Sequence, residues 1–231
     1  MKRFAGDAVV GLIFLALFLP FFLCEPLYAG YKSFNAAHAV LAGGIKFAVL
    51  STLGEIIALR IRTKGYDLKG FGVLPRMLVW FFLGAWIVMA MRIFGKGAPV
   101  LADYILNTDG KVTAAMTAGL SWYKFIGAFF ISLMQNTAFA PVFMTLHKIT
   151  DTHIMQGGGT LAGFLKPIHM GEIMQGIDWK RQWSFVFKKT IPFFWIPAHT
   201  VTFMLPGEYQ VLFAAFLGVV LGIILAFAAH K

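Results

Sequence analysis

The sequence predicts an all-α integral membrane protein: a bundle of about five transmembrane helices, with a broken or interfacial helix before the last one. Of the 231 residues, 59% are hydrophobic and only 13% are charged, whereas about a quarter of the residues in a soluble domain are charged. The apolar residues fall in long blocks, as they do in membrane-spanning helices. The 25 Phe and 6 Trp residues are typical of chains whose rings anchor helices at membrane interfaces. The length suits a single transmembrane domain, residues 1–231.

The first apolar block covers residues 4–23 and is predicted to be a retained span. It follows two basic residues, as a signal peptide would, but it is too long for the apolar part of a signal peptide and it contains Asp7. No pair of small residues marks a cleavage site before Cys24. Pro20 is expected to kink the far end of this helix.

The other predicted spans begin and end where the polarity of the sequence changes. A basic loop follows the second span, a loop with glycine and proline separates the third from the fourth, and a polar stretch follows the fourth. The predicted boundaries of these spans are 34–61, 77–94, 120–146 and 209–229.

The segment 183–205 combines features that favour a span with features that oppose one. It is largely apolar, but it contains Lys188, Lys189, Pro192 and Pro197. Charged side chains and prolines both oppose a regular helix through lipid. We therefore expect a broken or interfacial helix here, and the alternative is a sixth span.

The distribution of positive charge predicts the orientation in the membrane. The net charge is +10, and five spans place most Lys and Arg residues on the side of the N-terminus. Because cytoplasmic connections are enriched in these residues, the N-terminus is predicted inside and the C-terminus outside. A sixth span would bring the C-terminus inside. This placement argues against nucleic acid as a partner and favours anionic membrane lipids. It fits a bacterial cytoplasmic (inner) membrane, with an organelle membrane as the alternative.

Glu55 is the best candidate for a functional residue within a predicted span. Helical spacing puts Ser51, Glu55 and Arg62 along one stripe, which indicates a face turned toward the bundle. An ionisable residue inside a span is costly and often functional, so Glu55 is expected either to attract cations along a path or to bind protons. The alternative is an ion pair with Arg60, Arg62 or Arg76.

The fourth predicted span contains Gln135, Asn136 and Pro141. Pro141 has no N–H group and is expected to leave the carbonyl of Thr137 without its helical partner. Free carbonyls beside polar side chains coordinate ions or solutes in transporters. The alternative is a proline kink in which the two amides join neighbouring helices.

The last predicted span has small residues four apart, including Gly218 and Gly222. Such a ladder lets a second helix approach closely, either within the subunit or in a homo-oligomer. Enzyme motifs are missing from the sequence: it has no His-Glu-x-x-His helix and no Gly-x-Ser-x-Gly elbow. His169 and Glu172 are a single pair of possible metal ligands, which is weak evidence for a metal site. We therefore expect no enzyme activity, no metal and no cofactor.

Three segments together resemble the Mpv-seventeen family, which includes the twenty-two-kilodalton peroxisomal membrane protein. They are Gly54-Glu55, Phe139-Ala140-Pro141, and the stretch from Trp195 to Gln210. The family has Gly-Asp, Phe-Ala-Pro and a Trp-Pro-x-x-Gln-x-x-Asn-Phe stretch in the corresponding places. The chain departs from the family pattern at several positions. It has Glu55 where the family has Asp, His199 where the family has Gln, Thr202 where it has Asn, and Gln210 where it has Arg.

The resemblance implies a small helical membrane protein of inner mitochondrial or peroxisomal type, or a bacterial relative. The family is proposed to form channels or to govern the passage of small solutes. The resemblance adds Trp195 and His199 to the candidate residues and implies no catalytic residue.

The leading functional hypothesis is a small membrane channel or passive transporter for ions or small solutes. The alternative is a structural or scaffold membrane protein without transport activity. The candidate pore or ligand-binding residues are Glu55, Arg62, Gln135, Asn136, Pro141, Trp195 and His199.

Overall fold

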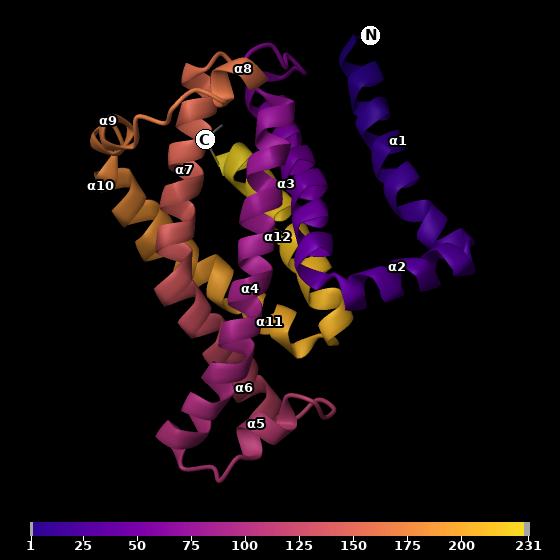
Figure 1. The fold of residues 1–231 in the computed structure, drawn as a ribbon, viewed down its shortest axis with the longest axis vertical. Helices are drawn as coiled ribbons and strands as arrows, with labels where there is room; N and C mark the ends of the chain where they lie inside the picture. Colours follow the sequence, from indigo (N-terminus) through magenta and orange to yellow (C-terminus); the bar gives the residue numbers. More distant parts are fainter. Residues whose placement is uncertain (1, 229–231) are drawn as a thin grey trace.

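The computed structural model describes residues 2–228, and within this range every regular element is helical (Figure 1). The helices are α1 (Lys2–Leu23), α2 (Glu25–Ala37), α3 (Ala39–Thr63), α4 (Val73–Leu106), α5 (Lys111–Ala115), α6 (Trp122–Met134), η1 (Gln135–Phe139), α7 (Ala140–Gln156), α8 (Leu161–Phe164), α9 (Met170–Gln175), α10 (Trp179–Arg181), η2 (Gln182–Trp195), α11 (Ile196–Met204) and α12 (Gly207–Ala228). The two elements labelled η are π-helices.

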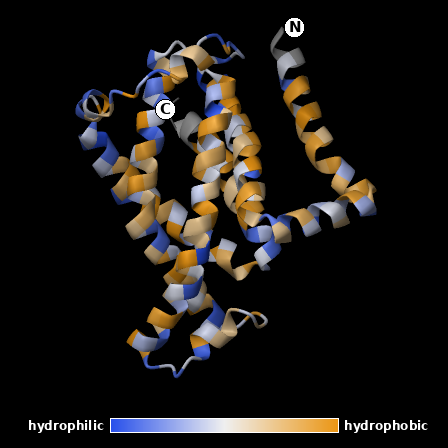
Figure 2. Cartoon of the chain, in the orientation of Figure 1, coloured by the Kyte–Doolittle hydropathy of each residue, from blue (hydrophilic) through white to orange (hydrophobic). Residues whose placement is uncertain are grey.

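Five helices of the described chain are long and apolar enough to cross a membrane. They are α1, α3, α4, the continuous helix formed by α6, η1 and α7, and α12. The prediction of an all-α membrane bundle is therefore confirmed. Figure 2 shows the hydrophobic residues along these helices and the hydrophilic ones gathered mainly at the two ends of the bundle.

The observed helix boundaries differ most from the predicted ones in three places. The second span begins at Ala39, because the chain leaves helical geometry at His38 and the preceding residues form the separate helix α2. The third span continues through Pro99 to Leu106, although a loop was expected from residue 95. The fourth extends to Gln156, beyond the predicted end at residue 146.

Helix α1 lies at the edge of the bundle. No residue in its apolar window is buried within the protein, so this helix is suited to face lipid on most sides. At its start, the Asp7 carboxylate accepts two hydrogen bonds of 2.9 Å from Arg60 and one of 2.8 Å from Tyr66. At its other end, α2 crosses to the foot of α3 (Figure 1).

The core of the bundle is α3, which packs against α4 on one side and α12 on the other. Glycines allow the close approach. A Cβ atom on Gly44 would lie 2.9 Å from the carbonyl oxygen of Phe81, and one on Gly54 would lie 3.0 Å from the Cα atom of Val219. Larger residues at these positions would push the helices apart.

The segment expected to be a broken or interfacial helix departs from regular α-helical geometry. It is π-helical from Gln182 to Trp195 and α-helical from Ile196 to Met204. Figure 1 shows it descending from the end of the bundle that carries α8 toward the start of α12. The wider π turns accommodate the missing N–H group of Pro192, so the helix continues through it.

The segment runs between α10 and α12 and is not among the five helices that are long and apolar enough to cross a membrane. Helix α12 runs back toward the end of the bundle at which α1 begins (Figure 1). The predicted number of about five spans is therefore found in the described chain, and the orientation in the membrane stays a prediction.

Candidate functional site

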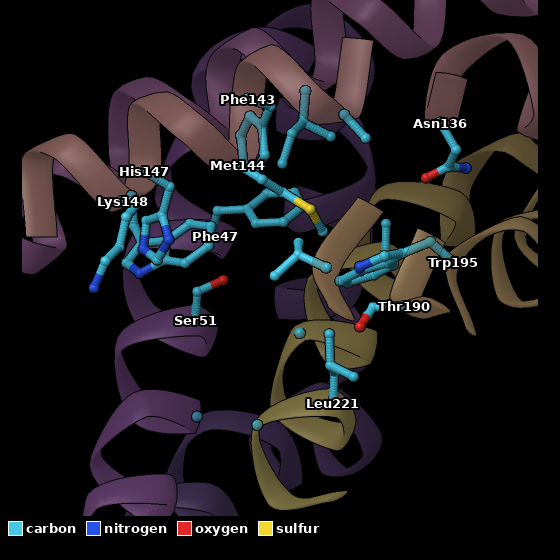
Figure 3. Close-up of a pocket in the computed structure, with 18 of the residues that line it drawn as sticks. Phe47, Ser51, Asn136, Phe143, Met144, His147, Lys148, Thr190, Trp195 and Leu221 are labelled. Atoms are coloured by element: carbon cyan, nitrogen blue, oxygen red, sulfur yellow. The ribbon is translucent and has the colours of Figure 1, made fainter. Parts of the chain in front are cut away.

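A cavity of about 380 Å³ lies inside the bundle. Its walls come from α3, α4, η1, α7, η2, α11 and α12. In Figure 3, His147 and Lys148 lie at one side of the cavity and Asn136 and Trp195 at the other, with Met144 between them. The two groups define a charged end and a polar end.

The charged end is built around Glu55 of α3. One carboxylate oxygen accepts a hydrogen bond of 2.6 Å from Arg76, and the other accepts one of 3.0 Å from the indole N–H of Trp80. The second oxygen also lies 3.2 Å from Nε2 of His147. Glu55 thus holds together α3, α4 and α7.

Arg76 is the centre of this group. Its guanidinium contacts a second carboxylate, that of Asp151, and donates a hydrogen bond of 2.7 Å to the carbonyl oxygen of Phe71. Only 8% of the Arg76 side chain is exposed. The bridge between two carboxylates satisfies most of its donors, as a buried guanidinium requires.

Glu55 is therefore ion-paired, as the alternative expected, and it also lines the cavity. Its role toward cations or protons stays a prediction. The partner is Arg76 and neither of the other two arginines considered. Arg60 pairs with Asp7, and Arg62 is exposed and does not line the cavity.

The polar end is built around Asn136, of which 1% is exposed. Its Nδ2 donates hydrogen bonds of 2.8 Å to the carbonyl oxygen of Ser132 and 3.0 Å to Nδ1 of His199. Because an amide nitrogen only donates, Nδ1 of His199 is the acceptor, and the proton of the neutral ring is on Nε2.

Four polar atoms of the cavity lining are buried without a hydrogen-bond partner in the described chain, and one of them, Oδ1 of Asp151, is in the ion pair with Arg76. The other three are the amide oxygen Oε1 of Gln135, the indole Nε1 of Trp195 and the hydroxyl of Ser51. Buried polar atoms are paired in the great majority of cases, so such a cluster needs an explanation.

Pro141 acts through the backbone and does not line the cavity. It occupies the first turn of α7, where a missing N–H group is tolerated, and one π-helical turn precedes it. That turn contains both Gln135 and Asn136, which the structure places on the cavity wall with 3% and 1% exposure. π-turns of this kind occur often at functional sites.

A second cavity, of about 410 Å³, lies at the opposite end of the bundle between α2, α4 and the start of α12. Its lining includes Lys32, Arg92 and Glu208. Met91 and Val211 line this cavity, Ile87 lines the first one, and all three pack in one apolar cluster. The linings of the two cavities thus meet in one apolar cluster, and these three residues are called the apolar layer below.

The small-residue ladder of α12 faces α3 of the same chain. A Cβ atom on Gly222 would lie 3.6 Å from the carbonyl oxygen of Gly54, and one on Gly218 would lie 3.8 Å from the Ser51 hydroxyl. The ladder therefore serves packing within the subunit and leaves room beside Ser51. A homo-oligomer through these glycines stays a prediction.

Of the seven candidate residues, Glu55, Gln135, Asn136, Trp195 and His199 line the cavity. The residues that sequence reasoning did not select are Trp80, His147 and Asp151. His147 and Asp151 are four residues apart on α7, so helical spacing was available as a signal. Among the residues described, no group of three or more His, Cys, Asp or Glu residues is placed to hold a metal ion.

Comparisons of this chain with protein-family models, with curated proteins and with solved structures find no match. The function is therefore argued from the two cavities and the apolar layer at which their linings meet.

Proposed function

We propose that this chain is a small membrane channel or passive transporter for small solutes or ions. The observation that carries the proposal is the pair of cavities whose linings meet at the apolar layer of Ile87, Met91 and Val211. Apolar constrictions of this kind close a path by excluding water. Opening the layer would join the two cavities into one route through the bundle.

The resemblance to the Mpv-seventeen family agrees with this proposal, since that family is proposed to govern the passage of small solutes. The proposed location is a bacterial cytoplasmic membrane, with an organelle membrane as the alternative. The basic residues that follow α3 support this location, because positive connections favour the cytoplasmic side.

The test is the passage of glycerol and of potassium chloride into liposomes that contain the purified protein, followed by light scattering. Met91 is 7% exposed and lies in the apolar layer, whereas Met89, on the same helix, is 44% exposed. We expect the wild type to pass at least one of the two solutes faster than empty liposomes do. Met91→Ala should raise that rate several-fold, and Met89→Ala should leave it unchanged.

Truncating Met91 is also expected to cost about 2–5 kcal/mol of stability. Each variant is therefore checked for a monodisperse peak in detergent, and Ile87→Val replaces Met91→Ala if the latter does not fold. Rates equal to those of empty liposomes, in the wild type and in a folded variant with a widened layer, would refute the proposal.

The second candidate function is a structural or scaffold protein. The bridge from Glu55 through Arg76 to Asp151 favours it, because this bridge joins three helices. In that case Glu55→Gln would lower the melting temperature without changing the passage of any solute.

A further inference from the structure

We propose that the polar end of the cavity binds the hydroxyl group of a small uncharged amphiphile, such as a monohydroxy alcohol, whose apolar part extends toward the charged end. This inference names the substrate class of the same cavity and rests, for its physiological role, on the proposed transport function.

The unpartnered atoms at the polar end define the head group of this ligand. Trp195 and His199 are one helical turn apart, and their ring centroids are 5.0 Å apart. The indole N–H of Trp195 is buried without an acceptor. Nε2–H of His199 also has no acceptor in the described part of the chain, since the single hydrogen bond of this ring is made by Nδ1.

The third group at this end is an acceptor. Oε1 of Gln135 is buried without a donor, and only 3% of the residue is exposed. A hydroxyl group accepts one or two hydrogen bonds and donates one. It can therefore accept from Trp195 and His199 while it donates to Gln135, which pairs all three groups with a single ligand oxygen.

The distribution of charge excludes an ionic head group at this end. Glu55, Arg76 and Asp151 pair with one another at the opposite end of the cavity, and Lys148 is exposed at its rim. Among the described residues, the polar end contains amides, an indole, an imidazole and the hydroxyl of Thr190, which donates to the carbonyl oxygen of Phe185, and no charged side chain. A carboxylate or an ammonium ion buried there would have no counterion, and burying such an ion is strongly unfavourable.

The wall between the two ends selects an apolar body. Phe47 of α3, Phe143 and Met144 of α7 and Leu221 of α12 surround the centre of the cavity in Figure 3. The volume of about 380 Å³ lies in the range of pockets that bind small organic molecules. Each methylene group buried there should tighten binding about fourfold.

The experiment follows the indole resonance of Trp195 in protein labelled with ¹⁵N-tryptophan and held in lipid nanodiscs. Trp195→Phe assigns the resonance. Because the signal comes from one side chain, it separates binding in the cavity from partition of the probe into lipid. The probes are 1-butanol, 1-hexanol, hexanoate, hexylammonium and hexane.

We expect a saturable shift with the alcohols, with 1-hexanol binding about 15-fold tighter than 1-butanol, and none with either ion. Gln135→Leu should weaken binding at least tenfold, whereas Gln175→Leu, at an exposed position on α9, should have no effect. Gly218→Leu should also abolish the shift by filling the space beside Ser51, and Gly11→Leu, where nothing lies within 4 Å, is its control.

The inference is wrong if no alcohol gives a saturable shift, or if hexanoate or hexylammonium binds as well as 1-hexanol. It is wrong, too, if hexane shifts the resonance as much as 1-hexanol does, because that result would indicate an acyl chain as the occupant. It is also wrong if Gln135→Leu and Gly218→Leu, both folded, bind like the wild type. Binding of 1-hexanol without passage of glycerol or salt would refute only the transport function. Passage without binding would refute only this inference.

Discussion

Arg76 offers the sharpest test of what holds the bundle together. Its guanidinium bridges Glu55 of α3 and Asp151 of α7 from the first turn of α4, and its side chain is 8% exposed. Replacing Arg76 with Met keeps most of the apolar stem and removes the charge. Two carboxylates, each 21% exposed, then face each other without a counterion.

Removing one partner of a buried ion pair costs about 3–5 kcal/mol, because a charge remains buried without compensation. For a chain of this size, about 1 kcal/mol corresponds to about 2–4 °C in melting temperature. Arg76→Met should therefore lower the melting temperature in detergent by about 6–20 °C. A second substitution, Glu55→Gln, removes one of the stranded charges and should recover part of this loss.

The assay is thermal unfolding followed by circular dichroism, with Arg62→Met as the matched control. Arg62 is exposed and lies two turns from Glu55 on α3, so its replacement should change stability by less than about 0.5 kcal/mol. If Arg76→Met and Arg62→Met unfold within about 2 °C of each other, the bridge contributes nothing measurable. If the double variant is less stable than Arg76→Met, the account of the stranded carboxylate is wrong.

Two further predictions concern the ends of the bundle. The Asp103 carboxylate accepts hydrogen bonds from two backbone N–H groups at the start of α5. Asp103→Ala should therefore lower the melting temperature in thermal unfolding, while Asp109→Asn, at an exposed position, should change it little. Burial, followed by the hydrogen bond to Asp7, raises the pKa of Tyr66 above its usual 10.0. The neutral phenol therefore stabilises the fold below about pH 10, and this advantage over Tyr66→Phe should disappear in unfolding curves measured above the raised pKa.

Hydropathy predicted the long apolar helices well, because each span is recorded in the sequence as a block of apolar residues. It could not predict where the helices continue beyond the apolar blocks. The third span was expected to start at residue 77, which left Arg76 outside it as one of three possible partners of Glu55. In the structure α4 begins at Val73, so Arg76 lies in its first turn and reaches Glu55.

The segment 183–205 shows a second limit of sequence reasoning. Its lysines and prolines oppose a regular span, and they predicted a broken or interfacial helix but not its backbone geometry. In the structure, Lys188 and Lys189 are exposed and Pro192 is accommodated in π-helical turns. Backbone geometry of this kind depends on packing against other helices, which a local pattern does not record. A local pattern could not predict the cavity either, because its polar end brings together residues about 60 positions apart in the sequence, such as the hydrogen-bonded Asn136 and His199.

The polar end of the cavity also bears on the choice between transporter and scaffold. An unpaired buried polar atom lowers the stability of the folded protein by about 1–3 kcal/mol. The unpaired atoms of Gln135 and Trp195 together therefore cost a sizeable part of the net stability of a typical domain, which is about 5–15 kcal/mol. A protein that only packs helices would gain stability from an apolar residue at position 135. Gln135→Leu should therefore raise the melting temperature of the ligand-free protein while it weakens the binding of alcohols. A gain in stability with a loss of binding is expected of a residue kept for its ligand, whereas a loss of stability would mean that Gln135 serves the packing of the bundle.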